Sequence, residues 1–178
     1  MRIYTTFNSR IQKYSLIAFL LAIFPLSNNG YARQSEVLVL DQSLTGVESA
    51  DMEWGDYDND GDLDLFIIGA KTVNSEIYQT ALYDNNGSGN FTLSPESSTF
   101  TNVFDGAVAW ADYDIDGDLD VIISGKLFNS TGTIIELYTN NGNKTFSKHP
   151  SFSTVHGEGI WNGDIDWGDY DNDGDLDV

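Results

Sequence analysis

Residues 54–64 read WGDYDNDGDLD, and nearly the same pattern returns as WADYDIDGDLD at residues 110–120 and as WGDYDNDGDLD at residues 167–177. The first Asp residues of consecutive copies lie 56 and then 57 residues apart. Each copy holds five Asp within nine residues, and no packed core accepts so many neighbouring carboxylates without compensation. A hard divalent cation held by oxygen ligands provides that compensation, so the motif predicts a repeated calcium-binding loop.

The charge of the chain is concentrated in these motifs. The formal net charge is −20, and fifteen of the 28 acidic residues are the Asp residues of the three copies. One divalent ion per copy would remove six negative charges. An acidic surface of this kind argues against nucleic acids and anionic membranes as partners. The plentiful aromatic residues, 13% of the chain, argue against an acidic disordered tail.

Residues 1–32 have the pattern of an export signal. Three basic residues and no acids accompany an apolar run at residues 15–26. The small residues Gly30 and Ala32 then occupy the −3 and −1 positions of a plausible cleavage site after Ala32. The run is shorter than the roughly 20 residues that a membrane-spanning helix needs. We therefore expect a secreted or cell-surface protein without a membrane span after signal cleavage; an uncleaved anchor is the alternative. The chain has no Cys, so metal is expected to provide part of the stability.

The segments around the motifs are rich in β-forming residues and show the same order in two copies. In the first copy, strands are predicted at residues 52–55, 63–69, 77–83 and 91–93. In the second copy, strands are predicted at residues 107–111, 119–124, 133–138 and 145–148. The acidic loop joins the first two strands of each copy, and Asn-Asn-Gly turns join the last two. A further strand is predicted at residues 36–40.

Four strands per repeat of about 56 residues, without helical periodicity, predict an all-β fold of β-propeller blades with four antiparallel strands. A solenoid and a sandwich are the alternatives. The blades are expected at residues 46–102, 103–159 and 160–178, the last one truncated. Residues 33–178 are therefore expected to form part of a propeller in a longer protein, and we hypothesise that the strand at 36–40 completes its last blade.

The loop positions suit calcium coordination. Loop positions are counted from the first Asp of each copy. The side chains at positions 1, 3 and 5 can point to one centre, and Gly at position 6 permits the sharp turn. The backbone carbonyl at position 7 and the carboxylate at position 9 then complete the six to eight oxygen ligands that calcium prefers. The predicted metal ligands are Asp56, Asp58, Asp60, Asp62 and Asp64; Asp112, Asp114, Asp116, Asp118 and Asp120; and Asp169, Asp171, Asp173, Asp175 and Asp177. Magnesium demands tighter octahedral geometry, and zinc would need nearby His or Cys. An EF-hand is excluded because Ile67 and Ile123 stand where it needs Glu.

The acidic motif, followed by a strand and later by L-Y-x-N-N-G, resembles the FG-GAP/VCBS repeat family, which includes the integrin α-subunit propeller and many secreted bacterial proteins. The resemblance covers residues 46–178. It implies a seven-bladed propeller with structural calcium in the loop between a blade's first two strands, and Asp ligands at positions 1, 3, 5 and 9. The Phe-Gly and Gly-Ala-Pro signatures that name the family are not recognisable in this sequence, which favours its bacterial branch over the integrins.

The recurring aromatic residues are interpreted as packing residues. Trp54, Trp110 and Trp167 are predicted to pack in the core or between blades, and the motif tyrosines Tyr57, Tyr113 and Tyr170 to shield the loops from water. Trp161 lies outside the repeat pattern and is the better candidate for a binding aromatic.

The sequence contains no catalytic constellation. Asp164 and Asp166 could suggest paired acid and base, but Asp51 and Glu53 occupy the equivalent positions of the first copy, so exposed strand positions are expected. We predict an exported, non-catalytic calcium-binding module for adhesion or for binding an extracellular protein or carbohydrate. The alternative is the non-catalytic propeller portion of a secreted polysaccharide-degrading enzyme.

Overall fold

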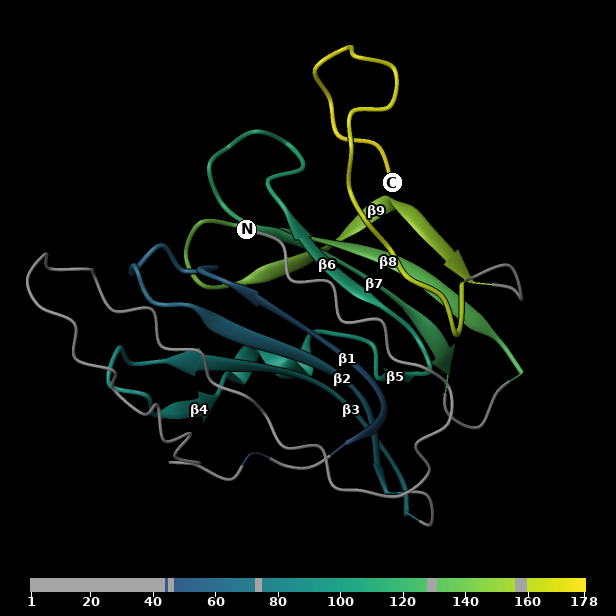
Figure 1. Ribbon diagram of the computed structural model, residues 1–178. Helices are drawn as coiled ribbons and strands as arrows, with labels where there is room; N and C mark the ends of the chain where they lie inside the picture. The colour runs from purple at the N-terminus through teal and green to yellow at the C-terminus, as the bar shows by residue number, and fades with distance from the viewer. Residues whose placement is uncertain (1–43, 45–46, 73–74, 128–130, 156–159) are drawn as a thin grey trace, which may run out of the picture.

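The computed structural model describes residue 44 and residues 47–72, 75–127, 131–155 and 160–178 (Figure 1). The predicted signal at residues 1–32 and the predicted strand at residues 36–40 lie outside the described residues. The described residues form antiparallel β-sheets and a short 3-10 helix, η1 (Pro95–Ser98). The all-β fold expected from the sequence is confirmed.

The first sheet has the strand order β1-β2-β3-β4, and every neighbouring pair is antiparallel. Its strands are β1 (Glu48–Gly55), β2 (Asp64–Thr72), β3 (Ser75–Asn85) and β4 (Phe91–Leu93). These are the four strands predicted for the first repeat, with β1, β2 and β3 extended at their ends. Residues 65–68 of β2 are all buried, which shows that both faces of this strand are covered.

The second sheet contains five strands because a short strand that was not predicted, at residues 103–104, precedes the predicted strand at 107–111. The strands are β5 (Val103–Phe104), β6 (Val108–Ala111), β7 (Asp120–Leu127), β8 (Thr133–Asn140) and β9 (Phe146–Val155). Both β5 and β6 pair with β7, at successive places along the same edge, so the sheet keeps the four-strand order of a blade with its first strand in two pieces. The break falls at Asp105, which has a φ of 51°, and at Gly106, where an added Cβ would lie 1.8 Å from the Ser124 carbonyl oxygen. The chain must bulge around that backbone contact.

The same backbone irregularity occurs once in each repeat. Ser49, Asp105 and Asn162 have φ values of 49°, 51° and 52°, and their spacings of 56 and 57 residues equal those of the acidic loops. The Asp105 N–H donates to the Ser49 carbonyl at 3.0 Å, and the Asn162 N–H donates to the Asp105 carbonyl at 2.6 Å. Consecutive repeats are therefore joined by backbone hydrogen bonds at equivalent positions.

A hydrophobic core lies between the two sheets, which face each other in Figure 1. The Trp110 ring packs edge-on against Phe66 at 5.5 Å and parallel to Tyr57 at 6.3 Å between centroids. Gly55 makes this packing possible, because a Cβ there would lie 2.9 Å from Trp110 Cδ1. The prediction that Trp110 packs between repeats is confirmed.

The other two motif tryptophans pack on the outer sides of this core. Trp54 packs against the buried cluster on the other face of the first sheet, with its ring 5.8 Å from that of Phe91. Trp167 packs with buried Ile165 against residues of the second sheet, so the third repeat covers that sheet. In the described part of the chain, no helix is long and apolar enough to cross a membrane.

Candidate metal centre

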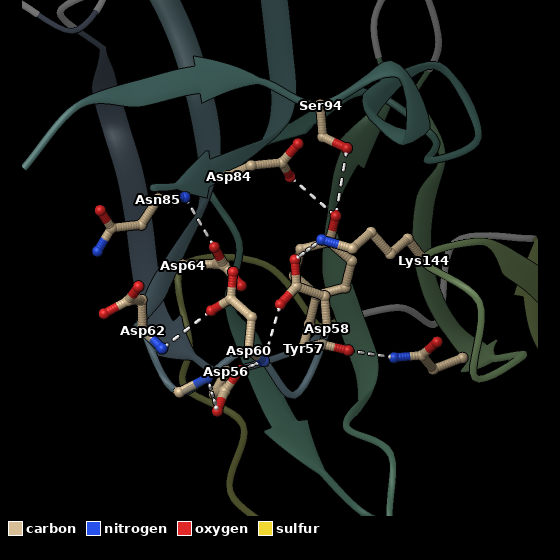
Figure 2. Close-up of polar contacts among 12 residues, drawn as sticks. Asp56, Tyr57, Asp58, Asp60, Asp62, Asp64, Asp84, Asn85, Ser94 and Lys144 are labelled. Atoms are coloured by element: carbon tan, nitrogen blue, oxygen red, sulfur yellow. Dashed lines mark hydrogen bonds and ion pairs between the residues drawn. The ribbon is translucent and has the colours of Figure 1, made fainter. Parts of the chain in front are cut away.

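The first acidic loop joins β1 to β2 and is curled by its own carboxylates (Figure 2). The N–H groups of Asp60 and Gly61 donate to the two oxygens of Asp56 at 3.0 and 3.1 Å, and Asp60 N–H also lies 3.1 Å from Asp58 Oδ1. Gly61 has a φ of 93°, a conformation that L side chains rarely adopt. The Asp and Gly positions of the motif therefore determine the local backbone.

The second and third loops repeat this geometry. In the second loop, Asp112 accepts hydrogen bonds from the N–H groups of residues 116 and 117 at 3.0 and 3.1 Å. In the third, Asp169 accepts from the N–H groups of residues 173 and 174 at 3.1 and 3.2 Å. Three segments far apart in the sequence thus form the same structure.

Each loop gathers its carboxylates at positions 1, 3 and 9. In each group, one oxygen from every member lies within 4.8 Å of the others. The groups are Asp56, Asp58 and Asp64; Asp112, Asp114 and Asp120; and Asp169, Asp171 and Asp177. The predicted ligands at positions 5 and 7 lie outside these groups: Asp60, Asp62, Asp116, Asp118, Asp173 and Asp175. At position 5, for example, Asp60 Oδ1 accepts the Asp62 N–H at 3.0 Å.

The position-9 carboxylates of the first two loops are fully buried. Asp64 and Asp120 each have 0% exposure, and each accepts an N–H from the end of the third strand, Asn85 or Asn140, at 2.8 Å. The second oxygen of Asp120 accepts the Tyr113 N–H at 3.0 Å. The second oxygen of Asp64 has no hydrogen-bond partner among the described residues. A buried carboxylate oxygen without a partner is costly, and Asp64 also belongs to a group of three carboxylates.

The electrostatics of these buried acids reflect the crowding of negative charge. Burial raises the pKa of Asp64 to about 7, and the carboxylates of Asp58, Asp60 and Asp84 add to the increase. Burial likewise raises the pKa of Asp120 to about 6, with further contributions from Asp114 and Asp116. A divalent cation within each group would reverse this penalty. The purely oxygen-based donor set fits calcium and does not fit zinc.

Several residues around the loops were not predicted from the acidic motif. Asn85 and Asn140 lie at the same position of the repeated L-Y-x-N-N-G pattern, and that repetition was the available signal. Lys144 comes from the turn between β8 and β9 and pairs with Asp58 of the first loop. This hydrogen bond raises the pKa of Lys144. No local pattern in the sequence indicates the contact, because 86 residues separate the two partners.

The motif tyrosines behave differently from one another. Tyr57 is buried, and its hydroxyl donates to Asp84 Oδ1 at 2.8 Å, which agrees with a role beside the first loop (Figure 2). Tyr113 is half-buried and lies against Trp167. Tyr170 is 90% exposed, so the expectation that it shields its loop was wrong. The ring of Tyr57 is buried because the second repeat packs over it.

Several further polar and aromatic residues lie outside the acidic motif. Asp164 and Asp166 are exposed, as expected. Trp161 is 52% exposed, and the Lys126 ammonium lies 3.7 Å from its ring centroid, covering one face of the ring. His149 accepts the Phe152 N–H through Nδ1 at 3.1 Å, and its ring packs edge-on against Tyr113 of the second loop at 5.9 Å between centroids. His156 lies outside the described residues.

The fold and the loops together define a class of protein, a tandem-repeat protein built from propeller-type β-blades with an acidic hairpin loop in each repeat. Comparison with protein families gives a match to the FG-GAP-like repeat at residues 56–123 and 125–178, more than half of the chain. The chain belongs to the FG-GAP-like repeat family, whose repeats are generally non-catalytic structural modules. Comparisons with curated proteins and with solved structures gave no match.

Proposed function

We propose that this protein is an exported calcium-binding propeller module that mediates adhesion or binds an extracellular protein or carbohydrate. One calcium ion per acidic loop has a structural role. The observation that carries the calcium proposal is the buried Asp64 oxygen without a hydrogen-bond partner, which belongs to a group of three carboxylates. A divalent cation satisfies this oxygen and offsets the repulsion between the carboxylates at once.

The residues that would hold the ion are the position-1, position-3 and position-9 aspartates of each loop. Position 1 also orders the loop backbone through its hydrogen bonds, and position 9 is anchored by the end of the third strand. Because these anchors come from both strands of the hairpin and from its neighbour, ion binding would tie three strands of a blade together. Calcium would therefore contribute to the folding free energy of the blade.

A calorimetric calcium titration of the full chain, with thermal melts in calcium and in chelator, tests this proposal. We expect two or three sites and a higher Tm in calcium, because the ion binds the folded loops and not the unfolded chain. Magnesium serves as the control ion and should raise the Tm less. The absence of any heat of calcium binding, together with identical melts in calcium and in chelator, would refute the metal role.

A single substitution in the second loop gives a further test. Asp114→Ala should lower the Tm in calcium and leave it nearly unchanged in chelator, because Asp114 is exposed and its hydrogen bond with the Asp116 backbone contributes little at an exposed position. Asp164→Ala, another exposed aspartate outside the loops, is the matched control and should leave both melts unchanged. Equal losses in calcium and chelator for Asp114→Ala would contradict a metal-ligand role.

Export rests on residues 1–32, with their basic start, apolar run and small residues before the expected cut. We expect the mature chain in the exported fraction of expressing cells, with residue 33 at its N-terminus. N-terminal sequencing of that fraction checks both points. A chain retained inside the cell with its original N-terminus would contradict export.

A further inference from the structure

The ligand-bearing segment of the first loop, residues 57–59, is held by the second repeat at three consecutive positions. Asn140 Nδ2 donates to the Tyr57 carbonyl at 2.8 Å, and Asn59 Nδ2 donates to Asp118 Oδ1 at 2.6 Å. Between them, the Lys144 ammonium pairs with Asp58 Oδ2. Figure 2 shows Lys144 reaching from the neighbouring sheet to this carboxylate.

We propose that Lys144 is a counter-cation of the first loop that weakens its calcium affinity. This inference rests on the proposed calcium function of the loops. The effect on the first loop comes from a residue that belongs to a different repeat.

The geometry of Asp58 carries the first step. Its side chain is only 1% exposed, and both of its oxygens already have partners, the Asp60 N–H on Oδ1 and the Lys144 ammonium on Oδ2. An ion that binds in the group of Asp56, Asp58 and Asp64 must therefore share Asp58 with a positive charge. That charge reduces the negative potential that attracts the ion.

The second loop has no such partner among the described side chains. Its position-3 residue, Asp114, is exposed. Of the other lysines with described side chains, Lys126 pairs with Asp105 and Lys148 pairs with Glu136.

The opposite effect, in which Lys144 would raise affinity by fixing Asp58 in place, is the smaller of the two. The Asp60 N–H already orients Asp58, and Asn140 and Asp118 hold its neighbours. The Lys144 side chain is 57% exposed, so solvent screening reduces its repulsion of the ion without removing it. We therefore expect a weakening of about three- to tenfold at low ionic strength.

The test isolates the first loop in the full chain with Asp112→Asn and Asp169→Asn, which disable the other two. Calcium is then titrated calorimetrically into this parent, into Lys144→Met and into Lys144→Arg. Lys144→Met should bind calcium about three- to tenfold more tightly, and Lys144→Arg should remain close to the parent because it keeps the charge. The gain should shrink in high salt.

Two controls separate a local effect from the overall change in charge. Lys126→Met removes the same charge from a lysine that pairs with Asp105, outside the acidic loops, and should change the affinity of the first loop less than twofold. With the first loop disabled by Asp56→Asn, Lys144→Met should leave the remaining sites unchanged. In chelator, Lys144→Met should lower the Tm and Lys144→Arg should preserve it, a readout independent of calcium.

The outcomes also separate this inference from the proposed function. An intact second loop that binds calcium, together with a first loop whose affinity is unchanged or weakened by Lys144→Met, overturns the inference alone. A chain that binds no calcium at any loop overturns the proposed function and the inference with it. Tighter binding in Lys144→Met but not in Lys144→Arg supports both.

Discussion

At the scale of single residues, Asp64 and Asp120 occupy the same position of the acidic motif but differ in their hydrogen bonds. Asp64 and Asp120 are equally buried and equally anchored by a backbone N–H. Asp120 has a second backbone donor, whereas the second Asp64 oxygen has no partner among the described residues. The penalty for an ion-free carboxylate is therefore greater at Asp64, and its pKa is raised further.

Replacing Asp64 by Asn should have opposite effects in the two conditions. In chelator, removal of the buried charge should stabilise the fold by about 1–2 kcal/mol, a Tm increase of roughly 4 °C. In calcium, the loss of a ligand should reduce the Tm increase that the ion provides. Thermal melts of Asp64→Asn and of the exposed control Asp164→Asn check this. A lower Tm of Asp64→Asn in chelator would show that the carboxylate stabilises the ion-free fold.

Position 4 of the second loop carries an unusual residue. Ile115 has a φ of 60° and is 68% exposed, whereas the equivalent residues Asn59 and Asn172 have φ values of 58° and 59°. Asn tolerates this left-handed conformation far better than a β-branched residue does. Ile115→Asn should therefore stabilise the protein by about 1 kcal/mol in calcium and in chelator alike.

Ile115→Val is the matched control for that substitution, because it keeps the β-branched side chain and should leave the Tm unchanged. Chemical denaturation with and without calcium measures both variants. An Ile115→Asn protein no more stable than Ile115→Val would mean that the loop backbone relaxes around the isoleucine at little cost.

At the scale of elements, the sequence indicated the strands and the acidic loops because both depend on local chemistry. Alternation and β-branched residues predict β8 (Thr133–Asn140), and the Asp and Gly positions determine the hydrogen bonds of each loop. The interruption between β5 and β6 was missed because it is imposed by the Ser124 backbone, eighteen residues after Gly106. The pairing of Lys144 with Asp58 was missed for a similar reason, since it depends on how two repeats pack.

Gly106→Ala tests the origin of the interrupted strand. The new Cβ would lie 1.8 Å from the Ser124 oxygen and 2.6 Å from Gly125 Cα, and backbone atoms cannot move away as a side-chain end can. We expect a loss of about 3 kcal/mol in stability, measured by denaturation. Gly168→Ala is the matched control, because no atom lies within 4 Å of its added Cβ. Similar stabilities for the two variants would show that the bulge has room to shift.

At the scale of the whole molecule, the repeats are joined by contacts that recur from one repeat to the next. The backbone bonds at Ser49, Asp105 and Asn162 link all three, and Asp51 Oδ2 accepts the Val108 N–H at 3.0 Å. Trp110 packs over Gly55 between the first two sheets. Because these contacts surround the loops, each loop's environment depends on the neighbouring repeat.

The three loops should therefore contribute unequally to stability in calcium. The third loop has all three carboxylates exposed, whereas Asp120 of the second loop is buried. Water already solvates the exposed charges, so an ion there relieves less repulsion than in the second loop. Asp112→Asn should lower the Tm in calcium by several degrees more than Asp169→Asn, while the two variants should melt alike in chelator. Melts of both variants over a range of calcium concentrations measure this difference, and an equal or larger loss for Asp169→Asn would show that burial does not set the contribution of a loop.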